Sequence, residues 1–94
     1  MDLQKYPIPH PQVAARVVEG TAVIVLADLG EVNVLNPVGT RVWELMNGAR
    51  TVQEIVNTIV AEYQVTPEQA LQDVQAFLQV LIDANALTLQ DSPV

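Results

Sequence analysis

Residues 35–48 hold the clearest structural signal in the chain and read Leu35-Asn36-Pro37-Val38-Gly39-Thr40-Arg41-Val42-Trp43-Glu44-Leu45-Met46-Asn47-Gly48. Asn36 is a favoured helix N-cap residue. Pro37 suits the first helical position, because the N–H that proline lacks would be unpaired there. Gly48 is the residue type that most often follows a helix end. The segment therefore predicts a strand end, a capped helix and a stop.

A second helix is predicted to begin at Thr51. Thr51 and Glu54 have the spacing of a capping box, in which each side chain bonds to the backbone N–H of the other residue. Apolar residues at helical spacing then follow, namely Ile55, Val56, Ile59, Val60 and Tyr63.

A third helix is predicted from Thr66 to about Ala84. Thr66 and Gln69 repeat the capping-box spacing, and Pro67 stands at the first helical position. Asn85 can adopt the left-handed conformation that ends many helices. The apolar surface of this helix is wide and includes Leu71, Val74, Phe77, Leu78 and Leu81. Either it is a central core helix or one of its faces lines a groove.

Three β-rich runs precede residue 36, at 13–19, 21–27 and 31–35, and predict a three-stranded antiparallel meander. Gly20 and Gly30 can supply the positive φ that tight turns require. The middle run is apolar at consecutive positions, which is typical of a central strand covered on both faces.

The third run alternates. Val32 and Val34 fall on one side, and Glu31, Asn33 and Leu35 fall on the other. If the strand order follows the sequence, this strand lies at the edge of the sheet.

The two ends of the chain are predicted to lie outside a domain that spans residues 13–89. In residues 1–12, Pro7, Pro9 and Pro11 exclude a helix or a central strand. This arm is either extended and packed on the body through Tyr6 and Ile8, or disordered. Residues 87–89 add a strand or pack under the sheet, and residues 90–94 form a tail.

The composition indicates one small cytoplasmic domain. The chain has 94 residues, half of them apolar, and no cysteine, which excludes disulfides, thiolate metal sites and thiol catalysis. The longest apolar run is only long enough for a strand, and the N-terminus lacks the apolar region of a signal peptide.

The charge is uneven along the chain. All four Lys and Arg residues lie in residues 1–50, whereas residues 51–94 contain acids and no basic residue. The net charge of −7 repels nucleic acid and anionic membranes, so neither is an expected partner. The acids form either an ordinary solvated surface or a face for a basic segment of a partner.

The residues do not support catalysis or metal binding. The only serine, Ser92, lies in the tail, and the only histidine, His10, lies among the prolines. A nucleophile, its base and an orienting group cannot be assembled from them, and a lone histidine is a poor metal site. We therefore expect no enzyme activity, no catalytic residues, no metal and no cofactor.

A sheet followed by three helices also suggests a winged helix-turn-helix DNA reader. Such a reader brings Arg or Lys to phosphates and base edges, and the second and third predicted helices contain neither residue. What remains is recognition of a protein segment, because an exposed edge strand can pair with an extended peptide.

The order and spacing of four segments resemble the PqqD-like family, small peptide-binding domains also called RiPP recognition elements. The segments are the strand end 34–37, the helix with Val42, Trp43, Leu45 and Gly48, the Thr51–Glu54–Ile55 helix start, and the ending from Leu81 to Leu87. The resemblance implies an α+β, winged helix-turn-helix-like fold with a three-stranded antiparallel sheet followed by three helices. It also implies that a leader peptide binds as a fourth strand between the third strand and the third helix.

The resemblance assigns the peptide-binding residues by position. The edge is Glu31, Val32, Asn33, Val34 and Leu35, and the facing wall is Asp73, Val74, Phe77, Val80 and Leu81. We rank core burial ahead of peptide contact for Val74 and Leu81, and favour Asn33, Leu35 and Phe77 for contact. The chain departs from the family at Val32-Asn33, where relatives often carry aromatic residues, and at Asn85, where they often carry glycine.

The function that the resemblance implies is capture of a ribosomally made precursor peptide by a stand-alone protein. Its partners would be the precursor's leader and a modifying enzyme, either a leader peptidase and cyclase of lasso-peptide synthesis or a radical S-adenosylmethionine (SAM) enzyme of pyrroloquinoline quinone (PQQ) synthesis. The strand departure favours the natural-product pathway. The alternative from another class is a homodimeric structural or regulatory protein.

Overall fold

The computed structural model describes residues 1–11, 13–26 and 29–94. Gln12 of the predicted arm, Ala27 of the second predicted strand and Asp28 of the predicted turn lie outside the described residues.

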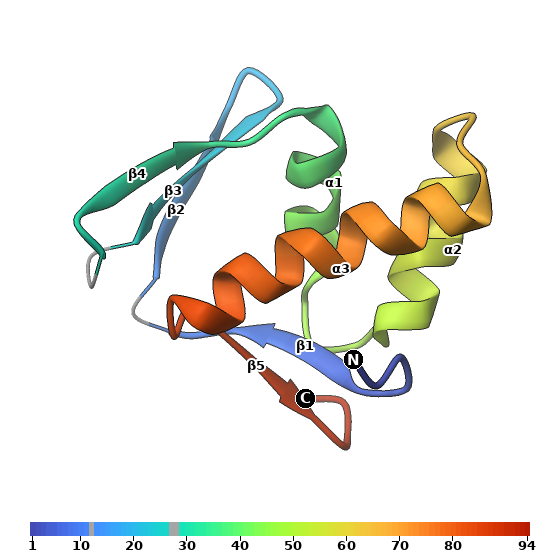
Figure 1. Ribbon diagram of the computed structural model, residues 1–94. Coiled ribbons are helices and arrows are strands. Elements are labelled where there is room, and N and C mark those ends of the chain that lie inside the picture. The colour runs from blue at the N-terminus through green and yellow to red at the C-terminus, as the bar shows by residue number, and fades with distance from the viewer. Residues whose placement is uncertain (12, 27–28) are drawn as a thin grey trace.

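The chain has the α+β fold predicted from its sequence (Figure 1). Strands β2 (Ala14–Val18), β3 (Thr21–Leu26) and β4 (Glu31–Val34) form an antiparallel sheet in the order β2-β3-β4. Helices α1 (Pro37–Leu45), α2 (Val52–Glu62) and α3 (Pro67–Asp83) follow. The chain then ends in β5 (Leu87–Gln90), which pairs with β1 (Tyr6–Pro9) in a separate two-stranded sheet.

The turn between β2 and β3 has two residues, and both have positive φ. Glu19 has a φ of 51° and Gly20 a φ of 79°, which is the pattern of a type I′ hairpin turn. Its twist matches that of the flanking strands, so the Val18–Thr21 pair and the rest of the β2–β3 register follow from it. Gly20 therefore has the predicted role, and Glu19 adopts a conformation that few residues with a Cβ adopt.

Strand β3 is central in the sheet but is covered on one face only. Ala22, Ile24 and Leu26 point into the core and are at most 4% exposed. Val25, on the other face, is 38% exposed. The prediction that both faces of this strand are covered was therefore wrong: the helices lie on one side of the sheet, and its apolar outer face is open (Figure 1).

Each helix begins at its predicted cap. Asn36 Oδ1 accepts the Gly39 N–H at 2.7 Å, and Thr51 and Glu54 form the complete capping box. Thr66 accepts the Gln69 N–H, but the Gln69 side chain donates to Asp73 Oδ1 instead of returning to the cap.

The helix ends are close to their predicted positions. Helix α1 ends at Leu45 with Met46 as its C-cap, so the chain leaves the helix shortly before the positive-φ Gly48. Asn85 has the predicted left-handed conformation, with a φ of 58° just after α3.

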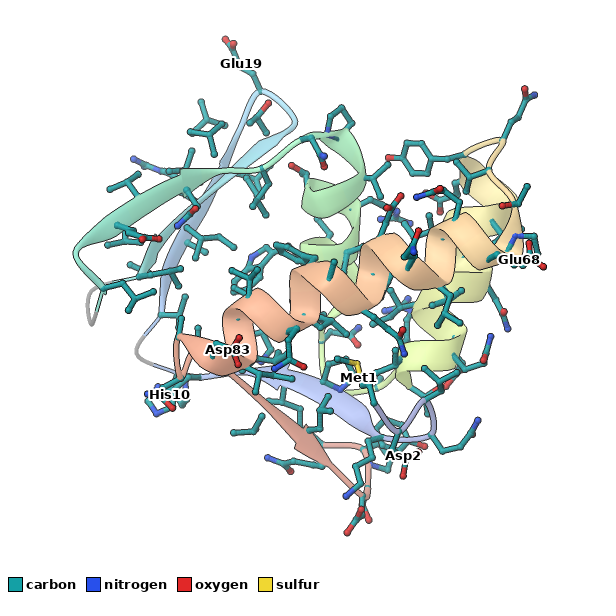
Figure 2. All side chains as sticks on the ribbon, in the orientation of Figure 1. Met1, Asp2, His10, Glu19, Glu68 and Asp83 are labelled. Carbon is teal, nitrogen blue, oxygen red and sulfur yellow. The ribbon has the colours of Figure 1, made fainter. Side chains whose placement is uncertain are left out.

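The core lies between the helices and the inner face of β3. Helix α3 places Ala70, Val74, Leu78 and Leu81 in it, so α3 is a core helix along one stripe. The Gln and acidic residues of α3 lie mostly on its exposed side, where Figure 2 shows Glu68 and Asp83 pointing away from the body.

The prolines of β1 fall at positions that lose no sheet hydrogen bond. The His10 N–H donates to Ala86 O at 2.8 Å. Backbone N–H and C=O groups of an antiparallel strand point alternately toward and away from the partner strand. The backbone groups of Ile8 and Tyr6 therefore also point at β5, and those of Pro7 and Pro9 point away from it. Residues 6–9 are therefore extended, as one of the two alternatives for the arm predicted, and residues 87–89 belong to the strand with which they pair. The buried residue of β1 is Pro7, whereas Tyr6 and Ile8, through which the arm was predicted to pack, are half-buried.

We expect Glu19→Asn to stabilise the protein by about 0.5–1 kcal/mol, because asparagine tolerates the left-handed conformation of a type I′ turn better than glutamate does. Urea unfolding monitored by circular dichroism measures the change. Glu19→Gln is the matched control, because it removes the same charge without supplying that backbone preference. Equal free energies of unfolding for the two variants would contradict the turn-strain explanation.

Candidate functional site

Strand β4 is an outer strand of its sheet. It pairs with β3 through Val23–Val34, Ile24–Asn33, Val25–Val32 and Leu26–Glu31, and no strand of the described residues pairs with its other side. This agrees with the predicted edge position.

The backbone hydrogen bonds decide which groups of β4 face the open side. The Leu35 N–H donates to Ala22 O at 2.9 Å, immediately beyond the β3–β4 pairs. Because the inward-facing residues alternate along an antiparallel strand, Asn33 and Glu31 also direct their backbone N–H and C=O groups at β3. Val32 and Val34 therefore direct theirs at the open edge.

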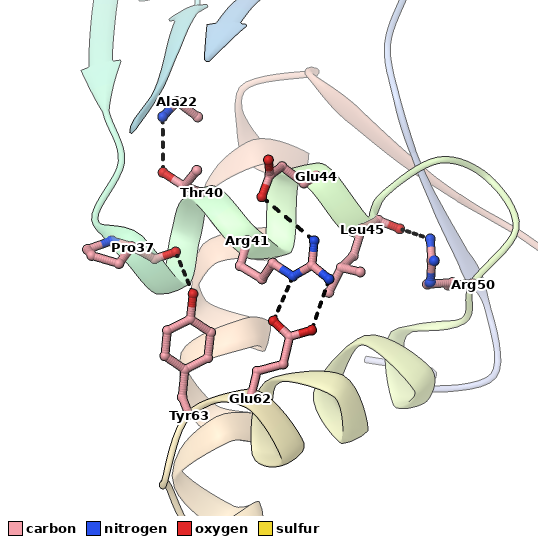
Figure 3. Close-up of polar contacts among 9 residues, drawn as sticks. All are labelled: Ala22, Pro37, Thr40, Arg41, Glu44, Leu45, Arg50, Glu62 and Tyr63. Atoms are coloured by element: carbon pink, nitrogen blue, oxygen red, sulfur yellow. Dashed lines mark hydrogen bonds and ion pairs between the residues drawn. The ribbon is translucent and has the colours of Figure 1, made fainter. Parts of the chain in front are cut away.

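The buried hydroxyl of Thr40, on α1, fixes the end of β4. It accepts the Ala22 N–H at 3.0 Å (Figure 3). It also donates to Leu35 O at 3.5 Å. The hydroxyl thus takes the place of a direct hydrogen bond from the Ala22 N–H to Leu35 O, which would otherwise be the next bond between the two strands. Helix α1 is joined to the sheet at this point.

Helix α1 is in turn joined to α2 by Arg41. Its guanidinium donates to both carboxylate oxygens of Glu62 at 2.8 and 2.9 Å, and Glu44 lies 3.8 Å away (Figure 3). The hydrogen bond with Glu62 raises the pKa of Arg41, and the same bond lowers the pKa of Glu62. Both side chains are about one-third exposed, so this fork orients the helices more than it stabilises the fold.

The side chains of β4 divide between two surfaces, as the predicted alternation requires. Val32 and Val34 are 66% and 69% exposed on the outer face. Asn33 and Leu35 are half-buried on the face that carries Ile24 and the core. The side-chain nitrogen of Asn33, Nδ2, is buried and has no acceptor among the described residues.

The five predicted residues of α3 do not share one surface. Val74 is fully buried and Leu81 is 2% exposed, so both belong to the core, as their ranking predicted. Phe77 is half-buried and packs against the core, whereas Asp73 is exposed and Val80 is 55% exposed. The spacing of these three residues, four and then three, puts them along one face of α3.

Helix α1 connects the two walls of the predicted site. It packs against both β3 and α3. Figure 1 shows α3 crossing α1 with its C-terminal end on the side of the sheet. Helix α1 therefore contacts both α3 and β3, the strand that pairs with β4.

The outer face of the sheet has a hollow of about 330 Å³ that was not predicted from the sequence. It is lined by Ala14, Ala15, Arg16, Val18, Val23 and Val25. The pairs Val23–Val34 and Val25–Val32 extend this apolar face to the edge of the sheet. The consecutive apolar residues of β3 were the available signal, and we interpreted them as a fully covered strand.

Among residues 1–11, 13–26 and 29–94, no group of three His, Cys, Asp or Glu side chains could hold a metal ion. Within the same residues, no helix is both long enough and apolar enough to cross a membrane.

Comparison with known families and structures gives three results. The family model described as coenzyme PQQ synthesis protein D (PqqD) matches residues 21–87. TbiB1, solved in complex with the TbiA(beta) leader peptide, is similar with 28% identity and a TM-score of 0.75 over 85% of this chain and 93% of TbiB1. A lasso peptide synthetase B1, solved with its leader peptide, has the same fold at 16% identity, with a TM-score of 0.75 over 88% of this chain and 98% of its own. No curated protein matches the chain.

We expect Thr40→Val to lower the free energy of unfolding by about 1–3 kcal/mol, because the buried Ala22 N–H loses its acceptor while the side chain keeps its shape. Urea unfolding gives the free energy, and amide hydrogen exchange reports on Ala22 and Leu35. Thr40→Ser is the control, because it retains the hydroxyl. If Thr40→Val exchanged no faster at these two amides than Thr40→Ser, the hydroxyl would not be what joins α1 to the sheet.

Proposed function

Because the chain belongs to the PqqD family, we propose that it captures the leader segment of a ribosomally made precursor peptide as an added strand on β4. In this proposal the domain binds the peptide without catalytic activity and delivers it to separate modifying enzymes.

The open edge of β4 is the observation that carries this proposal. Val32 and Val34 direct backbone N–H and C=O groups away from β3, and neither is a proline. A peptide in extended conformation can satisfy these groups as a neighbouring strand does. Such pairing supplies affinity that depends little on the peptide's sequence.

Side chains on the helix-facing side of the site determine which peptides bind. Leu35 and Phe77 are half-buried and apolar, and Val80 adds exposed apolar surface on the same face of α3 as Phe77. An added strand would place alternate side chains toward these residues. Val74 and Leu81 support this wall from the core and make no contact with the peptide.

The likeness to TbiB1 supports leader binding over other peptide ligands. It extends over 85% of this chain, and TbiB1 was solved with a leader peptide bound. The pathway that we propose is a lasso-type or other natural-product pathway, with a leader peptidase and a cyclase as the enzyme partners.

The second candidate is a peptide chaperone of PQQ synthesis, which works with a radical SAM enzyme. The description of the matching family favours it. The two candidates share the binding site and differ in the precursor, so the peptide that binds distinguishes them. A homodimer formed through β4 would use the same open edge, and it predicts self-association that rises with concentration and needs no peptide.

We expect Val32→Pro to weaken leader binding roughly tenfold or more, because it removes a backbone N–H from the open edge and leaves a peptide carbonyl unpaired. Fluorescence anisotropy measures the affinity, with a labelled leader from the precursor gene encoded nearest to this one and duplex DNA as the negative control. The proline belongs at Val32 and not at Asn33, because the Asn33 N–H faces β3 and its loss would disrupt the sheet.

Two variants control for other effects of this substitution. Val32→Ala removes the side chain and keeps the N–H, so binding should persist. Val17→Pro removes an outward N–H from the opposite edge strand, β2, and should also leave binding unchanged. Unaltered affinity in a folded Val32→Pro variant would rule out strand addition at β4.

A further inference from the structure

The buried side-chain amide of Asn33 has no acceptor of its own, and we propose that the bound leader supplies one. The leader residue opposite Asn33 carries a short, uncharged side chain with an oxygen acceptor: serine, threonine or asparagine. This inference rests on the proposed function and specifies the peptide that the same site selects.

The first support is the state of Asn33 itself. Its Nδ2 group is buried within the described structure and has no hydrogen-bond partner there. Buried polar groups of folded proteins are nearly always paired, because an unpaired donor loses its bonds to water without replacement. Asn33 lies on an edge strand, so rotation of its side chain toward that edge would present Nδ2 to a ligand bound there.

The second support is the alternation of hydrogen bonds along β4. An antiparallel peptide would form its backbone bonds with Val32 and Val34, the residues that flank Asn33. The peptide residue opposite Asn33 would then belong to a non-hydrogen-bonded pair, in which the two side chains come closest together. Both side chains lie on the helix-facing side of the sheet.

Distance limits the length of the peptide side chain. Cβ atoms of directly opposite residues are about 5 Å apart, and a hydrogen bond to an amide nitrogen spans about 2.9 Å. An oxygen one or two bonds beyond the peptide's Cβ therefore reaches Nδ2. The longer side chains of glutamine and glutamate would extend past it.

Charge excludes aspartate among the short acceptors. Glu31 lies on the same face of β4 as Asn33, and Asp73 and Asp83 are exposed on α3. The chain as a whole carries a net charge of −7. A carboxylate brought to this edge would be repelled, whereas a hydroxyl or amide oxygen would not.

Selection from a displayed library of random twelve-residue peptides tests this inference and does not require the sequence of the precursor. The wild-type protein should enrich serine, threonine or asparagine at one fixed position of the selected peptides. Asn33→Leu, which has a similar shape and no donor, should enrich aliphatic residues at that position and leave the other enriched positions unchanged. Selected peptides are then tested against Val32→Pro to establish that they bind at β4.

A double-mutant cycle with one selected peptide measures the strength of the hydrogen bond between the peptide's acceptor and Asn33. Replacing its acceptor residue by valine should weaken binding to the wild type roughly tenfold, and binding to Asn33→Leu less than twofold. In case Asn33→Leu does not fold, the wild type gives a direct reading by nuclear magnetic resonance. The side-chain amide protons of Asn33, assigned with Asn33→Ala, should shift downfield on binding the acceptor peptide and not the valine peptide.

The outcomes separate this inference from the proposed function. Peptides that lose affinity for Val32→Pro but show no acceptor at any fixed position, or leave the Asn33 amide unshifted, would overturn the Asn33 inference alone. An empty selection, or peptides insensitive to Val32→Pro, would overturn the proposed function and this inference with it.

Discussion

The hydrogen bond from the Leu35 N–H to Ala22 O determines the rest of the proposed site. It sets the alternation along β4, so that Asn33 bonds to β3 and Val32 and Val34 face the open edge. A shift of one residue would exchange these roles and would also turn Val32 and Val34 toward the core. The positions of the open main-chain groups and the half-buried side chains therefore depend on this one register.

Helix α1 maintains the register at the end of β4. Asn36 begins the helix, and the Thr40 hydroxyl, one turn later, bridges Ala22 and Leu35. The Arg41–Glu62 fork then joins α1 to α2. The strand end at Val34, the helix cap at Asn36 and the bridging hydroxyl of Thr40 lie within seven consecutive residues, so one short segment positions the edge strand against the helical core.

The two faces of the sheet differ in their physical character. The inner face carries the buried side chains of β3, and Asn33 Nδ2 is the only buried side-chain nitrogen or oxygen of the described residues without a hydrogen-bond partner. The outer face consists mainly of exposed valines and alanines around Arg16. A peptide added to β4 would extend both faces, and the half-buried inner side chains, rather than the exposed outer ones, would discriminate between peptides, because water there is already largely excluded.

Local sequence patterns predicted most elements of the fold and the ranking of several site residues. Caps, turn glycines and strand alternation are local effects, so Asn36, Thr51, Thr66, Gly20 and Asn85 could be assigned from their neighbours alone. The helical stripe of α3 likewise identified Val74 and Leu81 as core. Four features could be seen only in the folded chain: the direction of each N–H on β4, the unpaired Nδ2 of Asn33, the bridge made by Thr40 and the open outer face of β3. These features depend on contacts between segments that are distant in the sequence. The pattern of residues along one strand does not show which of its faces another part of the chain covers.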